Sequence, residues 1–155
     1  MKTLIVYATK NGGTAEIAQQ IAAELGLNNT TLHNLKDKPP NPADFDCIII
    51  GSSIYAAKIR KPAAIFIADN LGILYQKRVG LFLSGIKENQ EYWQQNFPPR
   101  LLAHCKSGKF LGGIFNPKKA GLIDRLVMRT VGKIKAHHNS VDPAKITTFI
   151  QNLKS

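Results

Sequence analysis

Apolar runs alternate along the chain with segments whose apolar residues recur at helical spacing. The runs predict strands near residues 2–8, 31–35, 46–52, 78–84 and 109–115. The helical spacing predicts helices near residues 14–26, 61–72, 89–105, 121–136 and 143–153. Within 89–105, Pro98-Pro99 is expected to break or kink the helix. Strands that alternate strictly with helices predict a parallel sheet with right-handed crossovers and helices on both faces.

The length of 155 residues predicts one domain, 1–155, large enough for a proper core. No apolar run approaches the roughly 20 residues that span a bilayer, and the N-terminus enters a strand almost at once, so neither a membrane span nor a signal peptide is expected. Cys47 and Cys105 lie far apart in the sequence. They predict two reduced thiols in a cytoplasmic protein, and neither a metal site nor a disulfide framework.

The charge of the chain is strongly and unevenly basic. Twenty-one Lys and Arg residues outweigh ten Asp and Glu residues, which gives a formal net charge of +11. Residues 100–141 carry nine basic residues against Asp124 alone, a net +8. This block predicts attraction to a carboxylate-bearing substrate, a membrane surface or nucleic acid. Nucleic acid is not the expected partner, because aromatic stacking platforms and a known binding motif are missing.

A loop of Thr, Lys, Asn and Gly residues, from Thr9 to Thr14, joins the first predicted strand to the first helix. The backbone N–H groups at a helix N-terminus and the positive end of the helix dipole favour an anion there. Glycines let the backbone close around a phosphate, and the hydroxyls of Thr9 and Thr14 add donors. The loop contains neither the P-loop motif of nucleotide hydrolases nor the Gly-x-Gly-x-x-Gly motif of dinucleotide-binding proteins.

The spacing of this loop resembles the flavodoxin signature at each defined position, Thr9-x-x-Gly12-x-Thr14-x-x-x-Ala18-x-x-Ile21. The resemblance implies an α/β, flavodoxin-like fold of three layers, with a doubly wound parallel sheet of five strands in the order 2-1-3-4-5. In that order, for which flavodoxin is itself a standard example, a cleft opens beyond the carboxyl ends of strands one and three. The cofactor implied is FMN.

Three loops are expected to hold the FMN. The resemblance implies that the phosphate lies on the first loop, formed by Thr9, Lys10, Asn11, Gly12, Gly13 and Thr14. The ring is expected to lie against the loops after strands three and four, formed by Ser52, Ser53, Ile54, Tyr55 and Ala56 and by Ser84, Gly85 and Ile86. Small residues allow close approach to a flat ring, and an aromatic side chain such as Tyr55 can stack on it. Trp93 is expected to be half-buried on a helix and not to contact the flavin.

An insert of about 116–141 follows the fifth predicted strand, where a minimal flavodoxin has a short loop. It contains a predicted helix with one apolar face and a basic stripe at Arg125, Arg129 and Lys133. With its Asp-Arg-apolar sequence, this helix resembles the insert of the flavodoxin-type, quinone-dependent protoporphyrinogen oxidases. The resemblance implies an FMN-dependent oxidoreductase that oxidises an anionic, porphyrinogen-type substrate and passes electrons to quinone. Its substrate or a membrane surface would meet Lys118, Lys119, Arg125 and Arg129.

Other interpretations stay open. The insert helix could pack its apolar face on the sheet and leave its charges in water. The protein could be a small electron carrier that docks to redox partners and has no substrate of its own. The histidines show no metal-ligand spacing, and no catalytic base is identified. A peripheral contact with the inner face of the cell membrane is compatible with the basic helix, because quinone is dissolved in the membrane.

Overall fold

The computed structural model describes residues 1–116, 118, 121 and 137–155. Its strands are β1 (Thr3–Ala8), β2 (Thr30–Asn34), β3 (Cys47–Tyr55), β4 (Lys58–Ile59), β5 (Arg78–Ser84), β6 (Ser107–Phe110), β7 (Ile114–Phe115) and β8 (His138–Asn139). Its helices are α1 (Gly13–Leu25), α2 (Lys61–Leu74), α3 (Glu91–Asn96), α4 (Pro99–His104) and α6 (Pro143–Lys154), with 3₁₀ turns at η1 (Leu27–Asn29) and η2 (Pro42–Asp44).

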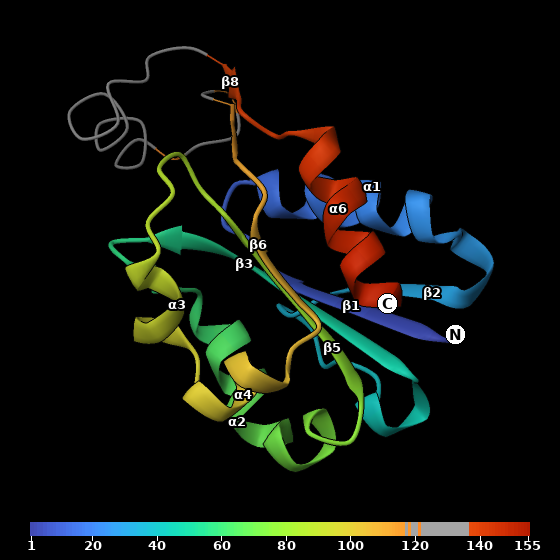
Figure 1. Ribbon diagram of the computed structural model, residues 1–155. Coiled ribbons are helices and arrows are strands. Elements are labelled where there is room, and N and C mark those ends of the chain that lie inside the picture. The colour runs from blue at the N-terminus through green and yellow to red at the C-terminus, as the bar shows by residue number, and fades with distance from the viewer. Residues whose placement is uncertain (117, 119–120, 122–136) are drawn as a thin grey trace.

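The main sheet has the strand order β2-β1-β3-β5-β6, and every neighbouring pair in that row is parallel. Because β4 only forms a hairpin with the end of β3, this is the predicted order 2-1-3-4-5. Helices α1 and α6 cover one face of the sheet, and α2, α3 and α4 lie on the other (Figure 1). The three-layer, doubly wound α/β fold is therefore confirmed.

The core consists of two apolar clusters, one on each face of the sheet. Successive residues of β3 supply them alternately, so Ile48 and Ile50 pack toward α2 while Ile49 packs toward α1 and α6. This two-sided burial explains why the strands are continuously apolar in the sequence. Gly51 and Phe82 are partners in the register, and a Cβ at Gly51 would fall inside the van der Waals contact distance of the Phe82 ring. The Phe82 ring therefore fits in the core only because residue 51 is glycine.

The structure corrects the predicted strand 109–115. The strand β6 runs from Ser107 to Phe110 only, and the chain then turns at Gly112, whose φ is +90°. A side chain at Gly112 would meet the backbone of Ser140, so the turn depends on glycine. Beyond it, β7 leaves the main sheet and pairs antiparallel with β8. The apolar run was therefore two short strands separated by a glycine turn.

The helices agree with the sequence more closely. The predicted helix 89–105 divides into α3 and α4 at Pro98-Pro99, because proline cannot continue a helix from the preceding turn. Asp142 caps α6, its carboxylate accepting a hydrogen bond from the Ala144 N–H at 2.9 Å. Apart from residue 121, the predicted helix at 121–136 lies outside the described residues.

We predict opposite effects for two glycine substitutions. Gly51→Ala will lower the free energy of unfolding by about 1–3 kcal/mol, because the Phe82 ring must shift out of a packed core. Gly72→Ala, within α2, will raise it by about 0.5–1 kcal/mol, because no atom lies within 4 Å of the added Cβ and alanine favours helix. Urea titrations followed by circular dichroism measure both. Equal effects of the two substitutions would contradict this packing.

Candidate functional site

A cleft of about 600 Å³ opens at the carboxyl ends of β1, β3 and β5. Parallel strands end at the same edge of the sheet, where the loops that follow them diverge and leave a crevice. The cleft is lined by four segments: the loop between β1 and α1, the β3–β4 hairpin with the start of α2, the loop between β5 and α3 with Tyr92, and the chain around β7. Apart from Gly12 and Ser52, every residue predicted to bind the cofactor lines it.

The loop between β1 and α1 is shaped by one glycine and one threonine. Gly12 has a φ of +89°, and its N–H donates to the Thr9 Oγ1 at 3.0 Å. The N-cap residue of α1 is Gly12, which has no side chain to form a capping hydrogen bond with the N–H groups of the first turn. These groups and the helix dipole make an anion site at the end of a 13-residue helix. Gly12 shapes this loop and does not line the cleft itself.

Glycine backbones meet where the chain around β7 crosses the cleft. A Cβ at Gly13 would lie 2.7 Å from the backbone oxygen of Ile114, and one at Gly113 would collide with the backbone of Gly85. The Gly85 N–H donates to the Gly112 oxygen at 3.0 Å, which holds the crossing in place. These contacts bring Ile114 and Phe115 into the wall of the cleft.

Two buried hydroxyls join the first loop to the third. The Oγ1 of Thr14 and the Oγ of Ser84 lie 2.7 Å apart, and either can be the donor. Thr14 is only 1% exposed and Ser84 only 3% exposed. When Ser84 donates, the Thr14 proton remains available to an anion in the loop. The pair thus sets both the position and the hydrogen-bonding state of the predicted phosphate donor.

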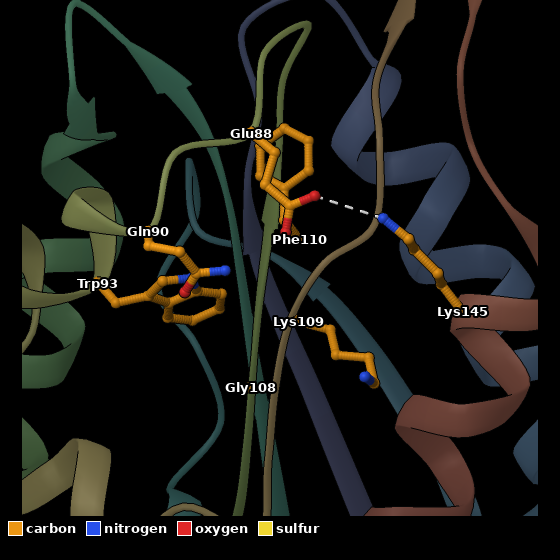
Figure 2. Close-up of a pocket in the computed structure, with 7 residues that line it drawn as sticks. All are labelled: Glu88, Gln90, Trp93, Gly108, Lys109, Phe110 and Lys145. Atoms are coloured by element: carbon orange, nitrogen blue, oxygen red, sulfur yellow. Dashed lines mark hydrogen bonds and ion pairs between the residues drawn. The ribbon is translucent and has the colours of Figure 1, made fainter.

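Two tyrosines line the cleft. Tyr55 lies before the turn of the β3–β4 hairpin and is 43% exposed, with the ammonium group of Lys10 5.1 Å from its ring centroid. Tyr92, on α3, also lines the cleft, and the sequence analysis did not predict this. Its neighbour Trp93 instead lines a separate small pocket beside Gly108 (Figure 2). The expectation that Trp93 stays away from the cleft agrees with this placement.

Ser52 has a structural position although it was predicted to meet the cofactor. It is 2% exposed, its hydroxyl donates to the Ser53 oxygen at 2.9 Å, and it accepts the Arg60 N–H at 2.8 Å. Ser52 therefore ties the start of α2 to the end of β3. The cleft-lining residues that the sequence analysis missed are Ala57, Arg60, Lys87, Tyr92, Gly113, Ile114 and Phe115.

The hairpin beside Tyr55 turns on two alanines with left-handed backbone. Ala56 has a φ of 50° and Ala57 a φ of 64°, between the paired residues Tyr55 and Lys58. Two-residue hairpin turns of this kind favour Asn and Gly, because a Cβ is strained at positive φ. Ala56 and Ala57 thus bring backbone and only small side chains to the cleft, as the sequence analysis expected of this loop.

Cationic groups border the cleft. Its lining residues include Lys10, Arg60 and Lys87, and none of the lining residues that the structure describes is Asp or Glu. Of the predicted basic contacts in the insert, Lys118 is exposed and its N–H donates to the Asn116 Oδ1 at 3.0 Å. Lys119, Arg125 and Arg129 lie outside the described residues. The cleft is therefore suited to an anionic, partly aromatic ligand.

Neither cysteine is suited to nucleophilic chemistry. Burial raises the pKa of the Cys47 thiol to about 12, and burial also raises the pKa of the Cys105 thiol. Across the described ranges, no three His, Cys, Asp or Glu residues form a possible metal site. His33 and His104 each place Nε2 within 3.0 Å of a backbone oxygen, as surface and helix-end histidines do.

The match to a family places these features in context. A model of the flavodoxin domain family matches residues 4–142, so the chain belongs to that family. A search of curated proteins gives no match. In the part of the chain that the structure describes, no helix has the length and apolarity needed to cross a membrane.

Solved structures show the same fold at low sequence identity. A flavodoxin from Fusobacterium nucleatum bound to flavin mononucleotide is 19% identical, with a TM-score of 0.54 over 99% of this chain and 98% of that one. The rubredoxin:oxygen oxidoreductase of Desulfovibrio gigas is 14% identical, with a TM-score of 0.57 over 98% of this chain and 36% of that one. An archaeal flavodoxin is 20% identical, with a TM-score of 0.53 over 70% and 78%.

We predict that the two thiols react at very different rates in the native protein. At pH 8, a pKa of about 12 leaves roughly one Cys47 thiol in 10,000 ionised, and the side chain is fully buried. Cys47 will react with a thiol reagent only when the protein unfolds, whereas half-buried Cys105 will react earlier. Reaction in Cys47→Ser and Cys105→Ser proteins, with and without urea, distinguishes the two. Rapid labelling of native Cys47 would contradict the described core.

Proposed function

We propose that the cleft binds FMN. Membership of the flavodoxin domain family, the uncapped start of α1 and a cleft with two tyrosines support this together. The phosphate would be held by the backbone and hydroxyl groups of residues 9–14, as the sequence predicts. The ring would lie against the loop bearing Tyr55 and the segment from Ser84 to Tyr92. The glycine crossing at β7 fits a flat ligand, because it adds an apolar wall without filling the cleft.

FMN, when bound, supplies two-electron chemistry at its ring, and the chain supplies binding, orientation and electrostatics. Thr14 would donate its hydroxyl proton to a phosphate oxygen while its oxygen accepts from Ser84. Tyr55 would stack on the ring and hold it out of water on one side. Ile114 and Phe115 would limit access of water from the side of β7. No residue of the described cleft is assigned as a catalytic base.

We further propose that the substrate is a porphyrinogen-type molecule and that quinone accepts the electrons. The supporting observation is the combination of apolar walls and cations with no carboxylate among the described lining residues. Such a surface attracts a macrocycle with carboxylate arms, because the charges pair while the apolar parts lose contact with water. The resemblance of the insert to that of quinone-dependent protoporphyrinogen oxidases supports the same proposal. Lys118, Lys119, Arg125 and Arg129 would contact substrate or an anionic lipid surface.

A small electron carrier is the second candidate. It is favoured by fold similarity to small flavodoxins over nearly the whole chain. Such a carrier would have no substrate of its own and would dock to redox proteins. The net charge of +11 would then require an acidic partner.

We predict that Thr14→Val will weaken FMN binding by about 1–3 kcal/mol, because one charge-assisted hydrogen bond is lost while the shape is kept. Ser84→Ala, the matched control, removes the partner hydroxyl and leaves the Thr14 proton available, so its effect on affinity will be smaller. Quenching of FMN fluorescence measures the affinity, and urea titration reports separately on stability. Equal losses from both substitutions would show that the pair acts on the fold and that Thr14 does not contact the phosphate.

We predict steady-state oxidation of protoporphyrinogen by the FMN-loaded protein with a menaquinone analogue as acceptor. Arg125→Ala combined with Arg129→Ala will raise the KM for substrate or weaken binding to anionic vesicles, with FMN retained, because two cations are removed outside the cofactor loops. The fluorescence of the porphyrin product measures the turnover and the KM of both proteins. Intact FMN binding without turnover would favour the electron carrier, and loss of FMN from the double variant would make the insert a structural cover.

A further inference from the structure

Besides Lys10 of the phosphate loop, two cationic residues line the cleft on the segments that would hold the ring. Arg60 directly precedes α2, after the hairpin that carries Tyr55, and the hydrogen bond from its N–H to Ser52 fixes its backbone. Lys87 follows Ile86 in the loop between β5 and α3. Both residues line the cleft, on the two segments that would hold the ring.

The carboxylate closest to Lys87 in the sequence, that of Glu88, pairs with a residue outside the cleft. Glu88 follows Lys87, but its carboxylate is 3.4 Å from the ammonium group of Lys145 on α6. Figure 2 shows this ion pair at the separate small pocket that Trp93 and Lys109 also line. Glu88 is therefore not among the residues that line the cleft, and it does not offset Lys87 there.

The start of α2 adds a further positive contribution. Arg60 is the N-cap of a 14-residue helix, and no side chain forms a capping hydrogen bond there. The positive end of the dipole of α2 therefore lies at the same wall of the cleft as the Arg60 side chain. Helix dipole and side chain act in the same direction on any charge that develops in the ring.

Reduction changes the charge of the bound group. FMN that takes up two electrons and one proton becomes FMNH⁻, so its ring gains one negative charge. A cation beside the ring stabilises FMNH⁻ more than neutral-ring FMN, because the Coulomb energy is gained only by the charged form. Binding energy that differs between the two forms appears directly as a shift of the midpoint potential.

We propose that Arg60 and Lys87 raise the midpoint potential of FMN in this cleft by binding the anionic reduced form, so that the protein serves as an electron acceptor from an organic hydrogen donor. This rests on the proposed binding of FMN, and it deepens that proposal by setting the direction of electron flow. The hydrogen donor loses the two electrons and the proton that form FMNH⁻, and its second proton passes to solvent. A protein with this cleft binds FMNH⁻ more tightly than FMN.

The experiment compares the FMN-loaded wild type with Arg60→Gln, Lys87→Gln and the double variant by potentiometric titration with dithionite and reference dyes. Each substitution will reduce the preference for FMNH⁻ over FMN by about threefold to tenfold, because one partly solvated charge is removed. For a two-electron couple that is a fall of about 15–30 mV, since a tenfold change equals about 30 mV. Raising the salt concentration will lower the wild-type potential and reduce the difference between the proteins.

Two matched controls separate charge from structure. Lys106→Gln removes the same charge from an exposed side chain before β6, at the far end of that strand from the cleft, and will leave the potential unchanged. Arg60→Lys keeps the charge and will keep most of the wild-type potential. FMN bound with one potential in all variants would overturn this inference and leave the proposed cofactor intact. Failure of the wild type to bind FMN would overturn both.

Discussion

The close approach of glycine backbones at the carboxyl edge of the sheet is the constraint on which the cleft depends. Gly13 lies against the backbone oxygen of Ile114, and Gly113 lies against the backbone of Gly85. Any side chain at these positions would push the loops apart. The crossing adds to the wall of the crevice that parallel strands leave open, and it brings Ile114 and Phe115 into that wall.

The fold and the site place different demands on the same strands. Two-sided burial of β1, β3 and β5 makes the sheet a rigid base, because each strand packs against helices on both faces. Polar chemistry is therefore confined to the residues where the strands end. There, small side chains, tyrosines and cations replace the apolar runs. Family membership and the shape of the cleft together support FMN as its ligand, and the charge of the lining supports a role as electron acceptor.

Local patterns made most of the architecture predictable. Apolar runs and helical spacing predicted the strands and most helices, because two-sided burial leaves a clear periodic signal, and the resemblance to flavodoxins implied the strand order. The loop between β1 and α1 was predictable as a wall of the cleft because its glycine and threonine spacing is local. The turn at Gly112 and the pairing of β7 with β8 were missed, since that pairing joins residues separated by the insert. Which of Tyr92 and Trp93 lines the cleft depends on how α3 is rotated about its axis. Arg60 lines the cleft because the β3–β4 hairpin places it there. Neither placement follows from residue spacing in the sequence.

The most direct test of the central claim is a titration of the cofactor-free protein with FMN, followed by calorimetry and by flavin fluorescence. We predict saturable binding of one FMN per chain, with riboflavin binding far more weakly because it lacks the phosphate that residues 9–14 would hold. A protein that binds no FMN, or that binds riboflavin equally well, would contradict the assignment of this cleft.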